Sequence, residues 1–225
     1  MSYILNIETA TTNCSVSLSK EGETIILKED YGNGYSHAER LHVYIEAVLK
    51  QANITMDDVD AVAVSKGPGS YTGLRIGVSA AKGLCFAADK PMISVATLEA
   101  LAHQVNIDDG VIVPMIDARR MEVYSAILDS KYNMIRGVEA QVLETTSFET
   151  YLAQGKVHFI GNGVEKTKTL IQHPNAVFIE GKLPSANEMS GLAFDKYKKD
   201  DIVDVAYFEP YYLKDFIAIK PKSKV

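Results

Sequence analysis

A glycine-rich loop is the feature of the sequence whose residue types and spacing most resemble a ligand-binding motif. It runs from Lys66 to Gly73, after the apolar run 60–65 and before a stretch with helical spacing. Backbone N–H groups at such a turn can bind a phosphate or another anion. The loop matches neither standard phosphate motif, however. Leu74 and Arg75 follow where a P-loop has Lys and Ser or Thr, and the three glycines miss the dinucleotide spacing by one residue. The other interpretation is a tight turn that lets the helix pack close to its strand.

Two acidic residues occupy matching positions 109 residues apart. Glu8 and Asp117 each end an apolar run, in 4–8 and 111–117, and each is followed by a polar turn. Facing one another across a cleft, they could hold a metal-bound nucleotide or act as acid and base. Alternatively, each caps the turn that follows it. Glu8, Thr9 and Asp117 are therefore the candidate residues of a vestigial nucleotide cleft.

The remaining reactive residue types predict no catalytic centre. His37 and His42 are five residues apart, about 140° around a helix axis, so they cannot chelate one ion. The chain contains no Gly-x-Ser-x-Gly nucleophile elbow. Cys14 and Cys85 are too few for a zinc or disulfide framework, and we interpret them as packing residues. We expect no catalytic residue, no metal and no cofactor.

The helix predicted after the glycine loop has one face of small residues. Gly73, Gly77, Ala81 and Cys85 recur every four positions, so a slowly drifting side carries little bulk and another helix could approach it closely. This face could be buried within the chain or could meet a partner. The helix predicted at 36–52 also carries a second, weaker apolar stripe besides its main one.

Both helices therefore have more apolar surface than one core contact needs, which favours a partner-binding face. The candidate partner interface draws on both helices: Val43, Tyr44, Ala47, Gly73, Gly77, Ala80 and Ala81. On this hypothesis, Gly77→Leu would break assembly and leave the fold largely intact.

The elements that position these residues alternate between strands and helices. Apolar runs predict strands near 4–7, 14–19, 24–27, 60–65 and 91–95, helices at 36–52 and from the glycine loop to 88, and a further helix from about Thr97. Ser36 and Glu39 form a capping box for the first of these helices.

The opening pattern returns in the second half of the chain. After a linker signal at 106–110, strands are predicted at 111–116 and 123–128, and 157–163 repeats a strand followed by Gly-x-Gly. We expect two duplicated lobes, 1–105 and 106–225. They describe the α/β fold of actin, Hsp70 and sugar kinases, the ASKHA fold, in which a nucleotide lies between the lobes.

Composition limits the partners. The 225 residues carry a formal net charge of −6, and an acidic chain is a poor autonomous binder of nucleic acid. The basic residues that do concentrate are in the tail: Lys214, Lys220, Lys222 and Lys224. With no run of 18 apolar residues and no signal-peptide pattern at the start, we expect a cytoplasmic protein without a membrane span.

Several strings occur in an order that resembles the TsaB family of tRNA threonylcarbamoyladenosine proteins. They are residues 4–11, 66–77, 94–101, 116–119 and 210–213. Two departures are visible: Glu8 stands where Asp is usual, and Lys214 where Arg is usual.

The resemblance implies the ASKHA fold and a partner, the paralogue TsaD, which transfers the threonylcarbamoyl group to adenosine beside the tRNA anticodon. In that family the first two helices pack against the matching helices of TsaD, or against a second copy when the chain is alone. The complex also includes the ATPase TsaE, and tRNA is bound only through the complex.

TsaD carries its metal on a His-x3-His pair, and the matching positions here are Thr97 and Leu101. The stretch 183–187, near the position of the paralogue's carboxylate ligand, contains no Asp. The resemblance thus implies a non-catalytic scaffold that activates TsaD. The alternatives are an ATP-dependent small-molecule kinase of the same fold and a metallopeptidase, which the lack of histidine ligands disfavours.

Overall fold

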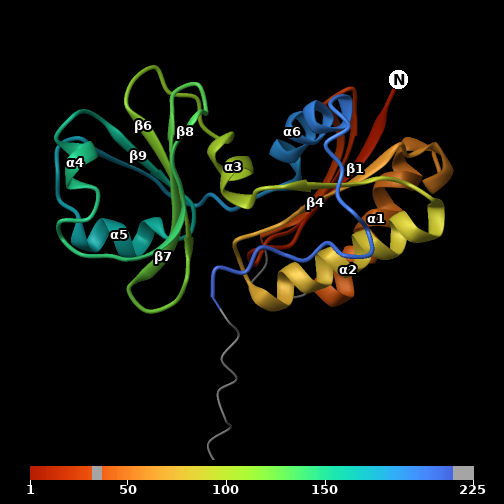
Figure 1. Ribbon diagram of the computed structural model, residues 1–225, viewed down its shortest axis with the longest axis horizontal. Coiled ribbons are helices and arrows are strands. Elements are labelled where there is room, and N and C mark those ends of the chain that lie inside the picture. The colour runs from red at the N-terminus through yellow and green to blue at the C-terminus, as the bar shows by residue number, and fades with distance from the viewer. Residues whose placement is uncertain (32–36, 215–225) are drawn as a thin grey trace, which may run out of the picture.

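The computed structural model describes residues 1–31 and 37–214, which form two α/β lobes joined through α3 and the segment after it (Figure 1). The first lobe contains β1 (Tyr3–Glu8), β2 (Cys14–Lys20), β3 (Glu23–Asp30), α1 (His37–Ala52), a short 3-10 helix (Met56–Asp58), β4 (Ala61–Ser65), α2 (Tyr71–Ala88), β5 (Met92–Val95) and α3 (Thr97–Ala102). The second contains β6 (Val111–Asp117), β7 (Glu122–Asp129), β8 (Met134–Val142), α4 (Glu149–Leu152), β9 (Val157–Ile160), α5 (Val164–Leu170) and β10 (Ala176–Ile179), and α6 (Ala186–Lys198) follows.

The two sheets have the same topology. The first has the strand order β3-β2-β1-β4-β5, and the second, read in the same direction, β8-β7-β6-β9-β10. In each, the first strand pairs antiparallel with the second and parallel with the fourth: β1 with β2 and β4, β6 with β7 and β9. The predicted two-lobed ASKHA fold with duplicated halves is confirmed.

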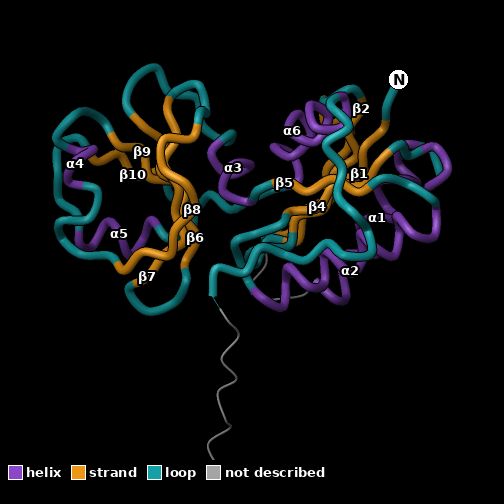
Figure 2. The backbone as a smooth tube through the Cα atoms, in the orientation of Figure 1, coloured by secondary structure: helices purple, strands orange, loops and turns teal. Residues whose placement is uncertain are grey.

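The first sheet is covered on both faces, which explains why its central strands are buried along almost their whole length. Alternate residues of β1 point to opposite sides. Leu5 and Ile7 pack in a core with α1 and α2, while Ile4 packs in a core with α6. Figure 2 shows α6 on one side of this sheet and α1 and α2 on the other.

The end of the chain returns to the first lobe. α6 packs against β1, β2 and β5, so residues 186–198 lie with the first sheet although they fall in the expected second part, 106–225. The segment after α6 then pairs with β5 through Met92 and Val203 and reaches the glycine loop, where Tyr211 N donates to Lys66 O at 2.7 Å. The lobes are therefore not a simple division of the chain at residue 105.

The two long helices predicted in the first lobe are present, whereas several predicted features lie outside the described residues. The helix predicted from the glycine loop to residue 88 is α2, and the one predicted at 36–52 is α1. Ser36 and the tail lysines after residue 214 lie outside the described residues, as does the capping box that Ser36 would form. None of the helices in the described part of the chain is long and apolar enough to cross a membrane.

Candidate functional site

The glycine loop is used for internal packing. Ser70 N donates to Ala10 O at 2.7 Å, and the Ser70 hydroxyl accepts from Gly73 N at 3.3 Å as the N-cap of α2. Two of the N–H groups that could bind an anion are thus already bonded within the chain. This agrees with the second interpretation of the loop, a tight turn that brings the helix close to its strand.

The small-residue face of α2 lies against the turn after β1. A Cβ atom at Gly73 would come within 2.1 Å of Thr9 O, and one at Gly77 within 2.2 Å of Thr9 Oγ1. The same hydroxyl donates to Gly73 O at 2.8 Å. Only a helix without side chains at these positions can approach the turn so closely.

Three residues of the predicted partner interface are therefore not available to a partner. Gly73, Gly77 and Ala81 are buried inside the chain and present no surface to a partner. The expectation that Gly77→Leu would leave the fold intact is wrong, because the new side chain would collide with Thr9. A four-residue spacing identifies a close contact but not the element that makes it.

The adjacent side of α2 is in part exposed and forms a groove with α1. The groove has a volume of about 560 Å³ and is lined by Ala38, His42, Arg75, Ile76, Ser79, Ala80, Gly83 and Leu84. Ala80 of the predicted interface borders it. Val43, also predicted, is 59% exposed on α1, and Tyr44 and Ala47 are half-buried.

Gly83 is one of several groove residues outside the predicted interface, and its glycine has no explanation within the described chain. A Cβ atom built there meets no heavy atom within 4 Å. Glycine in a helix interior costs about 1 kcal/mol relative to alanine, and no contact within the described chain requires it here. Gly83 also borders a second hollow beside Phe86, whose side chain is 87% exposed. The sequence did carry a signal, a helical glycine out of register with the small-residue face.

A separate cleft of about 570 Å³ lies between the lobes. Its walls are Ala10, Thr11, Gly69, Ser70, Tyr71 and Thr72 from the first lobe, Ile116, Asp117, Ala118, Arg119, Tyr124 and Asn162 from the second, and Lys214. Of the predicted cleft residues, Asp117 lines it, whereas Glu8 and Thr9 are buried behind its wall.

Glu8 does not face Asp117 as a second carboxylate of the cleft. Its Oε1 accepts from Ala10 N at 2.6 Å and from Ser65 Oγ at 2.8 Å. Burial raises the pKa of the Glu8 carboxyl to about 7, although these hydrogen bonds act in the opposite direction. The residue therefore holds the turn after β1, which agrees with the second of the two interpretations that the sequence left open.

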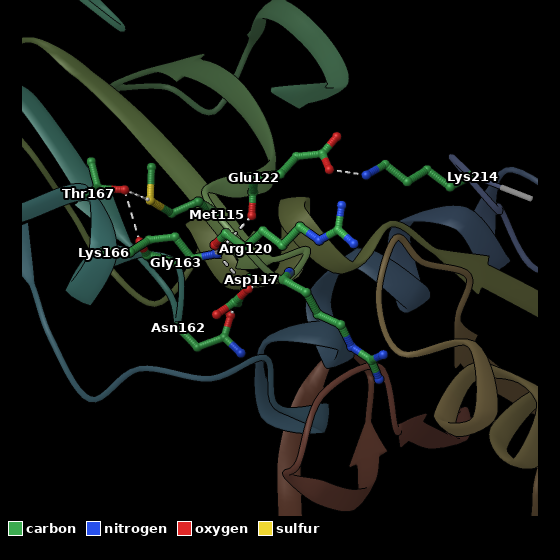
Figure 3. A network of polar contacts seen from close by, with 10 residues as sticks. Met115, Asp117, Arg120, Glu122, Asn162, Gly163, Lys166, Thr167 and Lys214 are labelled. Atoms are coloured by element: carbon green, nitrogen blue, oxygen red, sulfur yellow. Dashed lines mark hydrogen bonds and ion pairs between the residues drawn. The ribbon is translucent and has the colours of Figure 1, made fainter. Parts of the chain in front are cut away.

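Asp117 anchors the corresponding turn of the second lobe (Figure 3). Its Oδ1 accepts from Arg119 N and from Lys166 Nζ, both at 2.6 Å. Lys166 Nζ also donates to Arg120 O at 2.7 Å and to Glu122 O at 2.9 Å. The carboxylate is thus neutralised by Lys166, and the turn is held at several points.

Thr97 and Leu101, the two positions at which the resemblance implies a metal-binding pair in the paralogue, are engaged in internal contacts. Thr97 Oγ1 accepts from Gly67 N at 3.1 Å, and Leu101 is fully buried in an apolar cluster with Leu98. Within residues 1–31 and 37–214, no three His, Cys, Asp or Glu side chains are grouped so that they could hold a metal ion.

Histidine and cysteine positions agree with the sequence-based interpretation. His37 is buried, with Nε2 2.7 Å from Thr11 O, whereas His42 is exposed at the α1–α2 groove. The two therefore lie on different sides of α1. Cys14 and Cys85 are both buried and free.

Comparisons with known proteins identify relatives along nearly the whole chain. The family model of TsaD, tRNA N6-adenosine threonylcarbamoyltransferase, matches residues 34–218. The tRNA threonylcarbamoyladenosine biosynthesis protein TsaB of Escherichia coli is 32% identical, with 96% of each chain covered. TsaB of Bacillus subtilis is 30% identical over 94% of this chain and 93% of the relative.

The fold is also that of a solved relative. The structure of YeaZ from Pseudomonas aeruginosa superimposes with a TM-score of 0.81 at 28% sequence identity and covers 95% of this chain and all of the other. Both lobes, the groove between α1 and α2 and the cleft between the lobes thus fall in the part of the chain that has relatives.

Proposed function

The chain belongs to the TsaB family of tRNA threonylcarbamoyladenosine biosynthesis proteins, and from this premise we propose that it is a non-catalytic scaffold that binds and activates the transferase TsaD. The proposed complex includes the ATPase TsaE and binds tRNA as an assembly in the cytoplasm.

The observation that carries the proposal is the groove between α1 and α2. Five of its eight lining residues are apolar or glycine, and Gly83 leaves open space that no part of the described chain fills. Exposed apolar surface of this kind is typical of protein–protein interfaces. The exposed side chains of Val43 and Phe86 extend the apolar surface on either side of the groove.

The similarity to TsaD supports the choice of partner. The TsaD family model matches this chain over both helices of the groove. A pair of related proteins can therefore join through equivalent helices in a nearly symmetric interface, as identical subunits do in a twofold dimer. The same geometry allows the chain to form a homodimer when TsaD is absent.

Two features support the non-catalytic part of the proposal. The positions of the paralogue's metal-binding histidines hold Thr97 and Leu101, both buried in internal contacts. The two candidate carboxylates of the cleft, Glu8 and Asp117, hold turns. The same arrangement weighs against a kinase, since neither carboxylate is placed to hold a metal-bound nucleotide, and against a metallopeptidase.

Reconstitution of tRNA threonylcarbamoylation tests the proposal directly. Purified TsaD, TsaE and the enzyme that makes threonylcarbamoyl-adenylate are assayed with and without this chain, and the chain is assayed alone for hydrolysis of ATP. We expect modification only when the chain is present, and no turnover by the chain alone. Unchanged modification without the chain would refute the scaffold role.

A further inference from the structure

Arg119, which lines the interlobe cleft, and its neighbour Arg120 lack the partners that the other arginines have. Within the described residues, Arg119 and Arg120 form no side-chain hydrogen bond or ion pair. Arg40 pairs with Asp30, and Arg136 pairs with Glu139. Arg75 lies over the Tyr71 ring, 4.4 Å from its centroid. The two unpaired guanidinium groups are thus concentrated in a single turn, between β6 and β7.

The acidic residues beside this turn are already neutralised. Asp117 is paired with Lys166 at 2.6 Å, and Glu122 is paired with Lys214. Since each nearby carboxylate has its own lysine, the positive charges of Arg119 and Arg120 remain uncompensated. Figure 3 shows the Arg120 guanidinium directed away from the contact between Asp117 and Lys166. The turn therefore presents a local positive charge in a chain whose net charge is −6.

The backbone of the turn is held in a conformation that arginine disfavours. Arg119 has φ 70° and Arg120 has φ 52°, both in the left-handed region that glycine or asparagine would occupy more easily. Lys166 fixes the turn through Arg120 O and Glu122 O, and Asp117 fixes it through Arg119 N. Strain that the surroundings enforce is characteristic of binding sites.

The opposite wall of the cleft supplies complementary groups. The N-terminal end of α2 lies there with Ser70, Tyr71 and Thr72, and a helix N-terminus favours negative charge. Tyr124 lines the cleft from the second lobe. Basic side chains, hydroxyl donors and aromatic rings along one groove are the combination that binds a nucleic-acid strand, because the rings stack on bases and the cations meet phosphates.

We propose that the cleft between the lobes is an RNA-contact site in which Arg119 and Arg120 bind phosphodiester groups of the tRNA. The choice of tRNA rests on the proposed function, because a member of this pathway acts on tRNA. A metal-bound mononucleotide fits less well: Asp117 is already paired, and the Ser70 and Gly73 N–H groups are bonded internally.

The test measures tRNA affinity of the complex of this chain with TsaD by fluorescence anisotropy between 50 and 200 mM salt. Arg119→Ala/Arg120→Ala is compared with the natural chain. Each lost phosphate contact lowers the binding constant by about five- to eightfold at 0.1 M salt and lowers the salt dependence of binding by about 0.7 to 0.9. For two contacts we therefore expect an overall loss of roughly 25- to 60-fold and a salt slope smaller by about 1.4 to 1.8.

Two further variants separate charge from structure. Lys131→Ala/Lys156→Ala removes two exposed lysines at the other ends of β7 and β9, away from the cleft, and should leave tRNA affinity nearly unchanged. Arg119→Gly/Arg120→Gly should lose tRNA binding and yet raise the thermal stability of the chain, because glycine relieves the left-handed strain.

Three outcomes would overturn the inference. The first is an unchanged salt slope in Arg119→Ala/Arg120→Ala. The second is weaker TsaD binding by this variant without tRNA, which would assign the arginines to a protein interface. The third is ATP or AMP binding that depends on the arginines while tRNA affinity does not. If the natural chain fails to bind TsaD, the proposed function fails, and the same variants are compared for tRNA binding by the chain alone at 10 to 50 mM salt.

Discussion

Gly83 gives the sharpest test of how α2 divides its faces between the fold and a partner. It lies inside the helix, and a Cβ atom there meets nothing within 4 Å. Gly83→Ala should therefore stabilise the isolated chain by about 1 kcal/mol, the difference in helix propensity. For a protein of this size that corresponds to a melting temperature higher by about 2–4 °C.

Gly77→Ala is the matched comparison on the small-residue face of the same helix. The gain in helix propensity is the same, but the new methyl group would lie 2.2 Å from Thr9 Oγ1, which is held by its bond to Gly73 O. Overpacking of this kind costs up to about 3 kcal/mol, so the gain offsets only part of it. Gly77→Ala should thus lower the melting temperature while Gly83→Ala raises it.

A bulky side chain at Gly83 should weaken binding to TsaD. Gly83→Phe places a ring where a partner helix would approach, and separating two packed surfaces by this much should raise the dissociation constant at least about tenfold, or 1.4 kcal/mol. Gly137 on β8 also faces open space and is exposed, so Gly137→Phe adds the same ring away from the groove and serves as the control.

Calorimetric melting of the isolated chain and titration of TsaD by isothermal calorimetry measure the two effects. If Gly83→Phe binds TsaD as tightly as Gly137→Phe does, the groove is not the interface. If Gly83→Ala lowers stability, the assignment of Gly83 as free of internal contacts is wrong.

Three other predictions concern the turns that form the cleft walls. The pKa of the Glu8 carboxyl is about 7 in the folded chain and 4.5 when unfolded, so the folded state binds the proton more tightly. The free energy of unfolding should therefore be greatest below about pH 4.5, fall by an amount on the order of 3 kcal/mol as the pH rises to 7, and then level off. Urea titrations at pH 5 and pH 8 measure this fall, which Glu8→Gln should not show. Lys166→Met should lose donors to Asp117 Oδ1, Arg120 O and Glu122 O and destabilise the chain by about 2–3 kcal/mol in the same titrations. Thr97→Val should leave Gly67 N without its acceptor and cost about 1–3 kcal/mol, and Thr97→Ser should restore most of the loss; equal stability of the two variants would contradict this role.

The duplication of the fold could be predicted because the same short sequence pattern occurs in both halves of the chain. A strand, an acidic residue and a polar turn occur at Glu8 and again at Asp117, and each strand pairs with its neighbours in the same way. The tight-turn interpretation of the glycine loop was also accessible, since glycine without Lys and Ser or Thr lacks the chemistry of a P-loop. These features depend on residues close together in the chain.

What the sequence could not supply is the identity of long-range neighbours. α2 has apolar or small residues on most sides, so spacing alone does not say which side meets Thr9 and which lies open. The carboxyl of Glu8 could equally have pointed into the cleft; only the position of Ala10 N and Ser65 Oγ determines that it turns inward.

Long-range contacts also explain why the sequence did not predict helix α6. It contacts the first sheet partly through polar groups: Ser190 lies 3.3 Å from Asn6 Nδ2, and Ser17 Oγ donates to Ala186 O at 2.8 Å. The apolar stripe of α6 consists of Ala186, Met189 and Ala193 and is interrupted by Ser190, so it is a weaker signal than the stripe of an ordinary core-facing helix. The polar residues that match them, Asn6 and Ser17, are 184 and 169 residues away.

α2 takes part in both proposed sites, which restricts how they could communicate. Its middle lines the groove for TsaD, and its first residues line the cleft for RNA. Gly73 and Gly77 press the helix against Thr9, so it cannot slide independently of β1 without a collision. A change at the groove must therefore reach the cleft through side chains. Arg75 is suited to this, since it lines the groove and lies over the ring of Tyr71, which lines the cleft. Tyr71 in turn contacts Tyr212, at 4.9 Å between ring centroids, two residues before the Lys214 that pairs with Glu122 of the second lobe. Binding of TsaD at the groove would thus act on the arginine turn by way of this aromatic contact and residues 212–214, which reach the second lobe through the pairing of Lys214 with Glu122.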